Sequence, residues 1–238
     1  MGIYKIAGLY VEMDSYGRTL EQSIPYQIDS CPGIDIKVHS DIQYVKNLFP
    51  RLSDDDCEYL STGKSFYTQL FNFDGFMLHS SAVVVDNKAY LFTANSGTGK
   101  STHTSLWLQH FGQRAYIIND DKPALRLEDG IWYVYGTPWS GKHDISVNKR
   151  VPLAGIACLE RGETNTIEPF GGVQAIGAIL KQSTKSTEVE HRIKILELLD
   201  QLLTKVPVWK LKCNMEPEAV RLSYEAMSGR KLEDSNED

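Results

Sequence analysis

The tripeptide Gly-Lys-Ser occurs twice in the chain, at residues 63–65 and at residues 99–101. These are the residue types that a phosphate-binding loop requires. Glycines let successive backbone N–H groups point into one concavity, a lysine reaches the β- and γ-phosphates, and a Ser or Thr hydroxyl binds Mg²⁺ where a helix begins. Such a loop must follow a strand and precede a helix, and this requirement separates the two copies.

Residues 99–101 have the required setting. The apolar segment Ala89–Thr93 predicts a strand before the loop, and residues 100–111 predict a helix that ends near Gly112. Ala94 stands where the motif usually has its first glycine, and alanine is tolerated there while φ stays negative. We predict that nucleotide phosphates bind to Asn95, Ser96, Gly97, Thr98, Gly99, Lys100, Ser101 and Thr102.

Residues 63–65 lack this setting. Glu58 occupies the first position of the corresponding loop, and its carboxylate would repel a phosphate group. The segment before it is not an apolar strand. We therefore predict that residues 63–65 form a surface loop that binds no nucleotide.

A pair of carboxylates follows the next apolar segment. Residues 115–118 predict a buried strand that leads into Asn119, Asp120 and Asp121. One carboxylate at a strand end can bind Mg²⁺, and a second can accept the proton of an acceptor hydroxyl, so the pair suits phosphoryl transfer. The same composition is also typical of a simple turn.

The whole chain has the composition of an ordinary globular protein. It has 238 residues, of which 42% are hydrophobic and 24% are charged, and its net charge is −6. Because Lys and Arg are not clustered and no apolar run approaches membrane-spanning length, we expect neither a nucleic-acid nor a membrane partner. The four cysteines lack metal-binding spacing and the N-terminus lacks the apolar core of a signal peptide, so we expect a cytoplasmic protein.

The elements that must position these residues fall into two predicted parts. Residues 1–75 favour β-structure and carry no catalytic residues of their own, so we expect a small N-terminal domain that recognises a partner. Residues 76–230 mix hairpins with helices, which predicts an α/β fold with a mixed rather than purely parallel sheet. Residues 231–238 are charged and predict a disordered tail. Within the larger part we predict hairpins at residues 82–92 and 125–135 and helices at residues 189–203 and 217–227.

Three segments together resemble the superfamily of HPr kinase and phosphoenolpyruvate carboxykinase. They are Leu78–Val85 with its histidine, the loop Ser96–Ser101, and Asn119–Asp121. The motifs at residues 101–107 and 136–141 further resemble a branch of HPr-kinase-like proteins found with modified-peptide biosynthesis, some of which phosphorylate a serine of a precursor peptide. The resemblance implies a mixed-sheet kinase core of the HPr kinase type.

The resemblance also implies a role for each matched residue. Lys100 would hold the β- and γ-phosphates, and Ser101 would bind Mg²⁺. Asp120 and Asp121 would divide metal binding and base catalysis between them, and we favour Asp121 as the base and Asp120 as the metal ligand. His79 would contact that base or the acceptor phosphate, while a buried, hydrogen-bonded histidine is an equal alternative.

Two further residues are candidates on weaker grounds. Arg150 precedes a predicted strand and is a candidate to bind the γ-phosphate, although an ordinary surface arginine fits the sequence equally well. Trp139 lies in the Gly- and Pro-containing segment 136–142 and is a candidate to stack on adenine or to shield the site. The alternative for this segment is a simple turn with a partly buried tryptophan.

Taken together, these residues predict an enzyme that uses ATP and Mg²⁺ to phosphorylate a hydroxyl group, with serine of a peptide or small protein as the favoured acceptor. Two alternatives stay open: a nucleotide-binding switch without transfer, and a kinase of a small molecule such as free serine. The family resemblance also allows a homo-oligomer.

Overall fold

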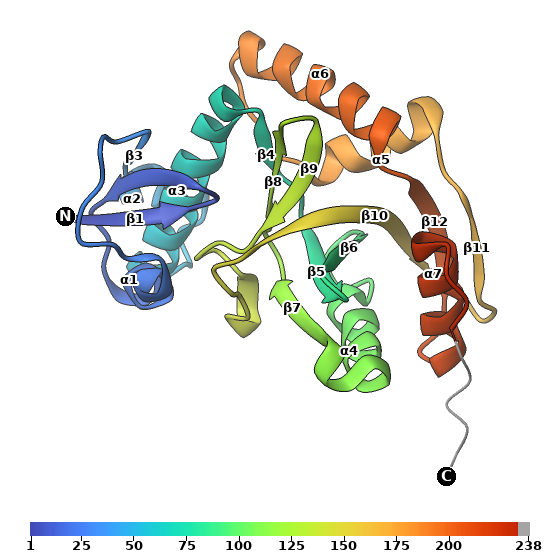
Figure 1. Ribbon diagram of the computed structural model, residues 1–238. Helices are drawn as coiled ribbons and strands as arrows, with labels where there is room; N and C mark the ends of the chain where they lie inside the picture. Colours follow the sequence, from blue (N-terminus) through green and yellow to red (C-terminus); the bar gives the residue numbers. More distant parts are fainter. Residues whose placement is uncertain (233–238) are drawn as a thin grey trace.

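The computed structural model describes residues 1–232 (Figure 1). It contains a small three-stranded sheet near the N-terminus and a nine-stranded sheet that forms the body of the molecule. The predicted disordered tail at residues 231–238 lies outside the described residues except for its first two positions. No helix within residues 1–232 is both long and apolar enough to cross a membrane.

The N-terminal part combines the small sheet with three helices. In the sheet, β1 pairs antiparallel with β2, and β2 pairs parallel with β3. Ser53 caps the helix α3 by accepting a hydrogen bond from the Asp56 N–H at 3.0 Å, and serine is a preferred residue at this position. The elements of this part are β1 (Gly2–Ile6), β2 (Leu9–Met13), α1 (Gly17–Ser23), η1 (Ile24–Tyr26), β3 (Ile36–Val38), α2 (Ile42–Leu48), α3 (Asp54–Gln69) and η2 (Leu70–Phe73).

The first Gly-Lys-Ser lies in the middle of α3, so the prediction of a surface loop at residues 63–65 is wrong. Gly63 is buried against the indole of Trp139, and a Cβ atom at this position would lie 2.9 Å from Trp139 Cδ1. The glycine is therefore a packing residue, and helix formation continues through it despite its low intrinsic propensity. Tertiary burial of the helix outweighs that local cost.

The large sheet is mixed, which confirms the predicted α/β fold class. Its main strand order is β4-β8-β9-β10-β6-β5-β7, and β12 and β11 extend it from β10. Both predicted hairpins are present, with β5 paired to β6 and β8 paired to β9. The strands are β4 (Gly75–Met77), β5 (Ser80–Val85), β6 (Lys88–Thr93), β7 (Ala115–Asn119), β8 (Ala124–Glu128), β9 (Ile131–Tyr135), β10 (Arg150–Arg161), β11 (Thr166–Pro169) and β12 (Val208–Cys213).

Helices cover both faces of this sheet. Along β5, Val83 and Val85 pack into the core formed with α4 and α7, while Ala82 and Val84 pack into the core formed with α5 and α6. Because alternate side chains enter opposite cores, the strand is apolar from Ala82 to Val85, as expected for a sheet covered on both sides. Figure 1 shows α6 above the sheet and α4 below it. The helices are α4 (Lys100–Phe111), α5 (Gly172–Gln182), α6 (Val189–Lys205) and α7 (Pro217–Ser228), with short 3₁₀ turns η3 (Gly112–Arg114) and η4 (Gly141–His143).

The helix predicted from apolar spacing at residues 189–203 is present as α6, but it is rotated from the expected orientation. The apolar spacing that predicts this helix consists of Val189, Ile193, Leu196, Leu199 and Leu203, and the first three of these are exposed in the structure. The buried residues of α6 are Ile195, Leu198, Leu199 and Leu202. The helix carries two overlapping apolar stripes, and periodicity alone did not identify the one that packs on the sheet.

The topology brings three chain segments to one edge of the sheet. Strand β5 runs antiparallel between β6 and β7, so the start of β5 lies beside the ends of both neighbours. Ser80 is opposite Thr93, the last residue of β6, and Ala82 is opposite Asn119, the last residue of β7. The loop after β6, the aspartates after β7 and the histidine before β5 therefore meet.

Candidate functional site

The segment between β6 and α4 joins the end of a strand to the start of a helix through two glycines with positive φ, which is the setting that a phosphate-binding loop requires. Gly97 has φ +77° and Gly99 has φ +120°, conformations that residues with a side chain rarely adopt. Lys100 starts α4 and is buried, and its Nζ lies 3.1 Å from the carbonyl oxygen of Ala94. Burial lowers the pKa of this lysine, while the charges of Asp121 and Asp120 act in the opposite direction.

The N-terminus of α4 is open to an anionic ligand. Its N-cap is Gly99, and within the described residues no side chain caps it. The first N–H groups of a helix have no partners within the helix, and its dipole favours negative charge at this end. Among the described residues, none has a heavy atom within 4 Å of a Cβ built at Gly97 or Gly99. The loop therefore has both the donors and the space that a phosphate group requires.

Asp120 is linked to the same end of α4 through hydroxyl groups. The Ser81 hydroxyl donates to Asp120 Oδ1 and lies 2.8 Å from the hydroxyl of Thr104. Thr104 in turn donates to the carbonyl oxygen of Ser101 at 3.2 Å. Asp120 and Ser101 both line a cleft of about 700 Å³ in front of the loop. This arrangement fits a Mg²⁺ ion held by Ser101, Asp120 and nucleotide phosphates together, because hard cations prefer oxygen ligands.

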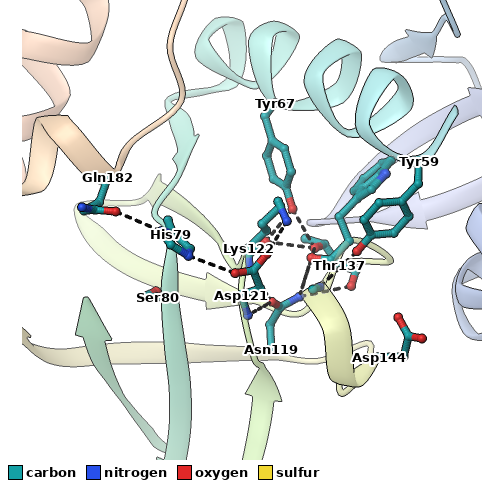
Figure 2. A network of polar contacts seen from close by, with 12 residues as sticks. Tyr59, Tyr67, His79, Ser80, Asn119, Asp121, Lys122, Thr137, Asp144 and Gln182 are labelled. Carbon is teal, nitrogen blue, oxygen red and sulfur yellow. Dashed lines mark hydrogen bonds and ion pairs between the residues drawn. The ribbon is translucent and has the colours of Figure 1, made fainter. Parts of the chain in front are cut away.

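Asp121 lines the same cleft, and its side-chain contacts differ from those of Asp120. His79 Nε2 lies 3.0 Å from Asp121 Oδ1, and the Lys122 ammonium pairs with Asp121 Oδ2. Burial by itself raises the pKa of Asp121, but the hydrogen bond from His79 and the charge of Lys122 outweigh it and hold the pKa well below its ordinary value. The carboxylate is therefore ionised at neutral pH. Figure 2 shows His79 on one side of Asp121 and Lys122 on the other.

Asn119 fixes the turn that presents the two aspartates. Its side chain is fully buried, and its Oδ1 accepts hydrogen bonds from the N–H groups of Asp121 at 3.1 Å and Lys122 at 2.8 Å. Its amide donates to the Thr137 hydroxyl at 3.1 Å. The turn that the composition indicates is therefore present, and it orients the two carboxylates.

Gln182 connects His79 to the loop between β6 and α4, a contact that no sequence pattern predicts. Its Oε1 lies 2.9 Å from His79 Nδ1, and its Nε2 donates to Asn95 Oδ1 at 2.9 Å. Gln182 ends α5, a helix that we did not predict, more than a hundred residues after His79. The chain Asn95–Gln182–His79–Asp121 runs from the phosphate loop to the carboxylate.

Arg161 is the arginine that contacts the loop. Because β10 is parallel to β6, with Cys158 opposite Thr93, the end of β10 lies beside the loop that follows β6. The Arg161 guanidinium donates to the carbonyl oxygens of Gly97 and of Thr98, the latter at 3.0 Å. In the sequence, Glu160-Arg161-Gly162 is typical of a turn at the end of a strand and does not by itself indicate a site residue. The contact of Arg161 with the loop depends on the parallel pairing of β10 with β6, which could not be predicted from the sequence.

The structure does not bring Arg150 to the loop, so its predicted contact with the γ-phosphate is corrected. Arg150 begins β10, a strand of 12 residues whose other end carries Arg161, which places the two arginines roughly 35 Å apart along an extended chain. Its Nη1 lies 2.9 Å from Glu128 Oε2, and its guanidinium lies over the ring of Tyr133. Arg150 behaves as the surface arginine of our alternative prediction.

Trp139 also has a different place from the one proposed for it. Its side chain is fully buried, stacks on Phe66 with ring centroids 5.0 Å apart, and donates from Nε1 to the Thr62 hydroxyl at 3.2 Å. It is therefore unavailable for stacking on adenine and packs against the N-terminal helix α3.

Gly141, two residues later, comes so close to Asp121 that an added Cβ would lie 2.5 Å from the Asp121 Cβ.

The N-terminal part supplies the wall of the cleft opposite the loop. Arg18 from α1 and Tyr59 from α3 line it, and the Arg18 guanidinium lies 4.2 Å from the centre of the Tyr59 ring. Arg18 also pairs with Asp144 at 2.6 Å, and the Tyr59 hydroxyl accepts a hydrogen bond from the Gly141 N–H at 3.1 Å. No site residue was predicted in the first 75 positions, because the contacts of Arg18 with Asp144 and of Tyr59 with Gly141 join residues more than 80 positions apart.

A second cavity, of about 350 Å³, adjoins the phosphate loop on its other side. It is lined by Thr98, Arg161 and apolar side chains that include Leu106, Leu159 and Met215. His103 of α4 also lines it, and burial lowers the pKa of this histidine to about 4, so the imidazole is neutral at pH 7. Within residues 1–232, no group of three or more His, Cys, Asp and Glu side chains could hold a metal ion by itself.

Comparison with known proteins gives limited information. No protein-family model matches the sequence, and no curated protein is significantly similar to it. Among solved structures, the chain is similar to the HPr(Ser) kinase/phosphatase from Coxiella burnetii, with a TM-score of 0.37 and 15% sequence identity. That match covers 64% of this chain and 99% of the other.

Proposed function

We propose that this protein is a kinase that transfers the γ-phosphate of ATP, with Mg²⁺, to a hydroxyl group, and that the acceptor is a serine of a peptide or small protein. The observation that carries the proposal is the convergence of a phosphate-binding loop and an ionised, polarised carboxylate on one cleft. A loop alone would support nucleotide binding. The carboxylate with its histidine adds the group that phosphoryl transfer to a hydroxyl requires.

Phosphate binding is assigned to the loop and the start of α4. The N–H groups of residues 96–101 would surround the β- and γ-phosphates, with Lys100 as the counter-charge. Ser101 and Asp120 would hold Mg²⁺, which neutralises charge on the phosphates and orients them. In this proposal the neighbouring cavity beside Arg161 receives the nucleoside, since its apolar walls suit a base.

The transfer step is assigned to Asp121. The acceptor oxygen attacks the γ-phosphorus, its proton passes to the Asp121 carboxylate, and the bond between the γ-phosphorus and the β–γ bridging oxygen breaks, which releases ADP. His79, held by Gln182, keeps the carboxylate oriented and ionised. A carboxylate of low pKa is a weak base, so most of the rate must come from positioning and charge neutralisation.

The test is transfer of γ-phosphate from labelled ATP with Mg²⁺ to serine-containing peptides, HPr and free serine. Asp121→Asn should reduce kcat by about 10²- to 10⁴-fold and leave ATP affinity almost unchanged, because it removes a proton acceptor and spares the loop. Asp120→Asn should raise the Mg²⁺ concentration required for half-maximal rate. Full activity of Asp121→Asn would overturn the base assignment, and tight ATP binding without transfer to any acceptor would favour a nucleotide switch.

A further inference from the structure

A third cavity, of about 180 Å³, is lined in part by Lys122 and by none of the loop residues 95–101. Its walls come mainly from apolar and aromatic side chains on the helix α3, the strand β4 and the segment after β9. The main lining residues are Tyr59, Leu60, Gly63, Tyr67, Met77 and Trp139. Gly63 belongs to the first Gly-Lys-Ser, and because it carries no side chain the Trp139 indole can pack close to α3 as one wall of the cavity.

This cavity adjoins the proposed transfer cleft and shares lining residues with it. Both spaces are lined by Tyr59, Leu60 and Lys122, and the Lys122 ammonium forms an ion pair with the Asp121 carboxylate. Figure 2 shows the rings of Tyr59 and Tyr67 on one side of Asp121 and Lys122, with His79 and Gln182 on the other. A group bound here would therefore lie beside the acceptor hydroxyl, on the side away from the nucleotide.

The walls of the cavity are held in place before any ligand binds. The Tyr67 hydroxyl donates to the Lys122 carbonyl oxygen and lies 2.8 Å from the Thr137 hydroxyl. The Tyr67 ring meets the Trp139 ring edge to face, with centroids 5.5 Å apart. With these polar atoms engaged, the cavity offers mostly carbon surface to a ligand. A rigid apolar pocket binds well, because no side chains need to be ordered on binding.

The size of the cavity restricts what can enter. Pockets for whole small ligands have volumes of about 300–1,000 Å³, so a space of about 180 Å³ is suited to one large side chain. We propose, resting on the kinase function above, that it is a specificity pocket for a large aliphatic or aromatic side chain one or two residues from the phosphorylated serine. The acceptor is then a peptide segment with an apolar neighbour, and free serine is a poor substrate.

The experiment compares peptides that differ only beside the serine, with Leu or Phe against Ala. We expect kcat/KM to be about 10-fold or more higher with the large side chain, since filling such a pocket gives differences of about 10- to 200-fold. Leu60→Ala enlarges the pocket and should shift the preference from Leu towards Phe or Trp. Met77→Phe fills it and should reduce the preference for large side chains.

Controls separate this inference from the proposed function. Leu48→Ala, at an exposed position on α2, should leave the preference unchanged, and thermal unfolding with ATP binding checks that each variant is folded. Binding of the same peptides is measured with a non-hydrolysable ATP analogue present. Selective binding without transfer would refute the kinase and keep the pocket. Transfer that is equal for Leu, Phe and Ala peptides, or best for free serine, would refute the pocket and keep the kinase.

Discussion

The two Gly-Lys-Ser tripeptides have the same residues and opposite structures. Residues 99–101 leave a loop after a strand and begin a helix, whereas residues 63–65 lie in the middle of one. Lys100 is buried at the cleft, and Lys64 lies on the exposed side of α3 with its ammonium 4.5 Å from the centre of the Tyr44 ring. The comparison teaches that the motif acquires its chemistry from the strand and the turn before it.

The largest contrast should appear when the two lysines are removed in turn. Lys100→Ala should weaken ATP binding by about 10- to 100-fold, since it removes a charge-assisted contact to phosphate, and should lower kcat by about 10²- to 10³-fold. Lys64→Ala should leave ATP affinity unchanged. Titration with labelled ATP measures both variants, and equal losses in the two would end the assignment of phosphate binding to the second copy.

The two copies also differ in what their glycines do, which a stability measurement can reveal. Gly63→Ala should reduce the free energy of unfolding by about 1–3 kcal/mol, because the new Cβ would lie 2.9 Å from the fully buried Trp139 side chain. Gly177→Ala is the matched control in α5, where within the described residues an added Cβ meets nothing within 4 Å. It should stabilise the helix by roughly 0.5–1 kcal/mol. Chemical denaturation would contradict the packing role of Gly63 if both variants gained stability.

Local patterns explain which parts of the site could be predicted from sequence. The loop, the helix over residues 100–111 and the strand before Asp120 and Asp121 depend on residues near one another in the chain, and the structure has all of them. Because of Glu58, we predicted that the first Gly-Lys-Ser does not bind phosphate. Residues 63–65 do lack the strand–loop–helix setting of such a loop, but they lie in a helix and not in the predicted surface loop. Its helix is determined by burial against Trp139, which is 76 positions away from Gly63.

The residues that sequence reasoning missed all depend on strand order or long-range packing. Arg161 reaches the loop because β10 is parallel to β6, and Gln182 reaches His79 from the end of an unpredicted helix. Arg18 lines the cleft because α1 packs on α3, which in turn packs on Trp139. Arg150 was chosen for its residue type alone, and the direction of β10 carries it away from the loop.

Removing Arg161 should have a smaller effect than removing Lys100. Arg161→Ala should weaken ATP binding by about 10-fold, because the loop loses the donor that holds the Gly97 and Thr98 carbonyl oxygens, while the phosphate contacts themselves remain. Arg114→Ala, an exposed arginine paired with Asp86, is the control and should have no effect on ATP affinity. Unchanged affinity in Arg161→Ala would show that the loop holds its shape without the arginine.

The smallest expected effect is a shift in the pH dependence of kcat/KM. It arises because Asp121 has a lowered pKa, whereas burial alone raises the pKa of a carboxylate. Burial raises the pKa of Asp121, and the bond from His79 is the first of the contacts that lower it. In His79→Ala, the charges of Lys122 and Lys100 still oppose burial, but the hydrogen bond from His79 is lost, so the pKa of Asp121 must rise. A base acts only when ionised, and activity is therefore lost as the pH falls through that pKa.

The acid side of the kcat/KM profile should consequently move to higher pH in His79→Ala, with the rate at acid pH reduced more than the rate at pH 8. His110→Ala, at the far end of α4, is the matched histidine control and should keep the profile of the unaltered protein. A uniform loss of rate at every pH would mean that His79 only positions the carboxylate. An unmoved profile with full activity would mean that Asp121 is not the group whose ionisation the reaction requires.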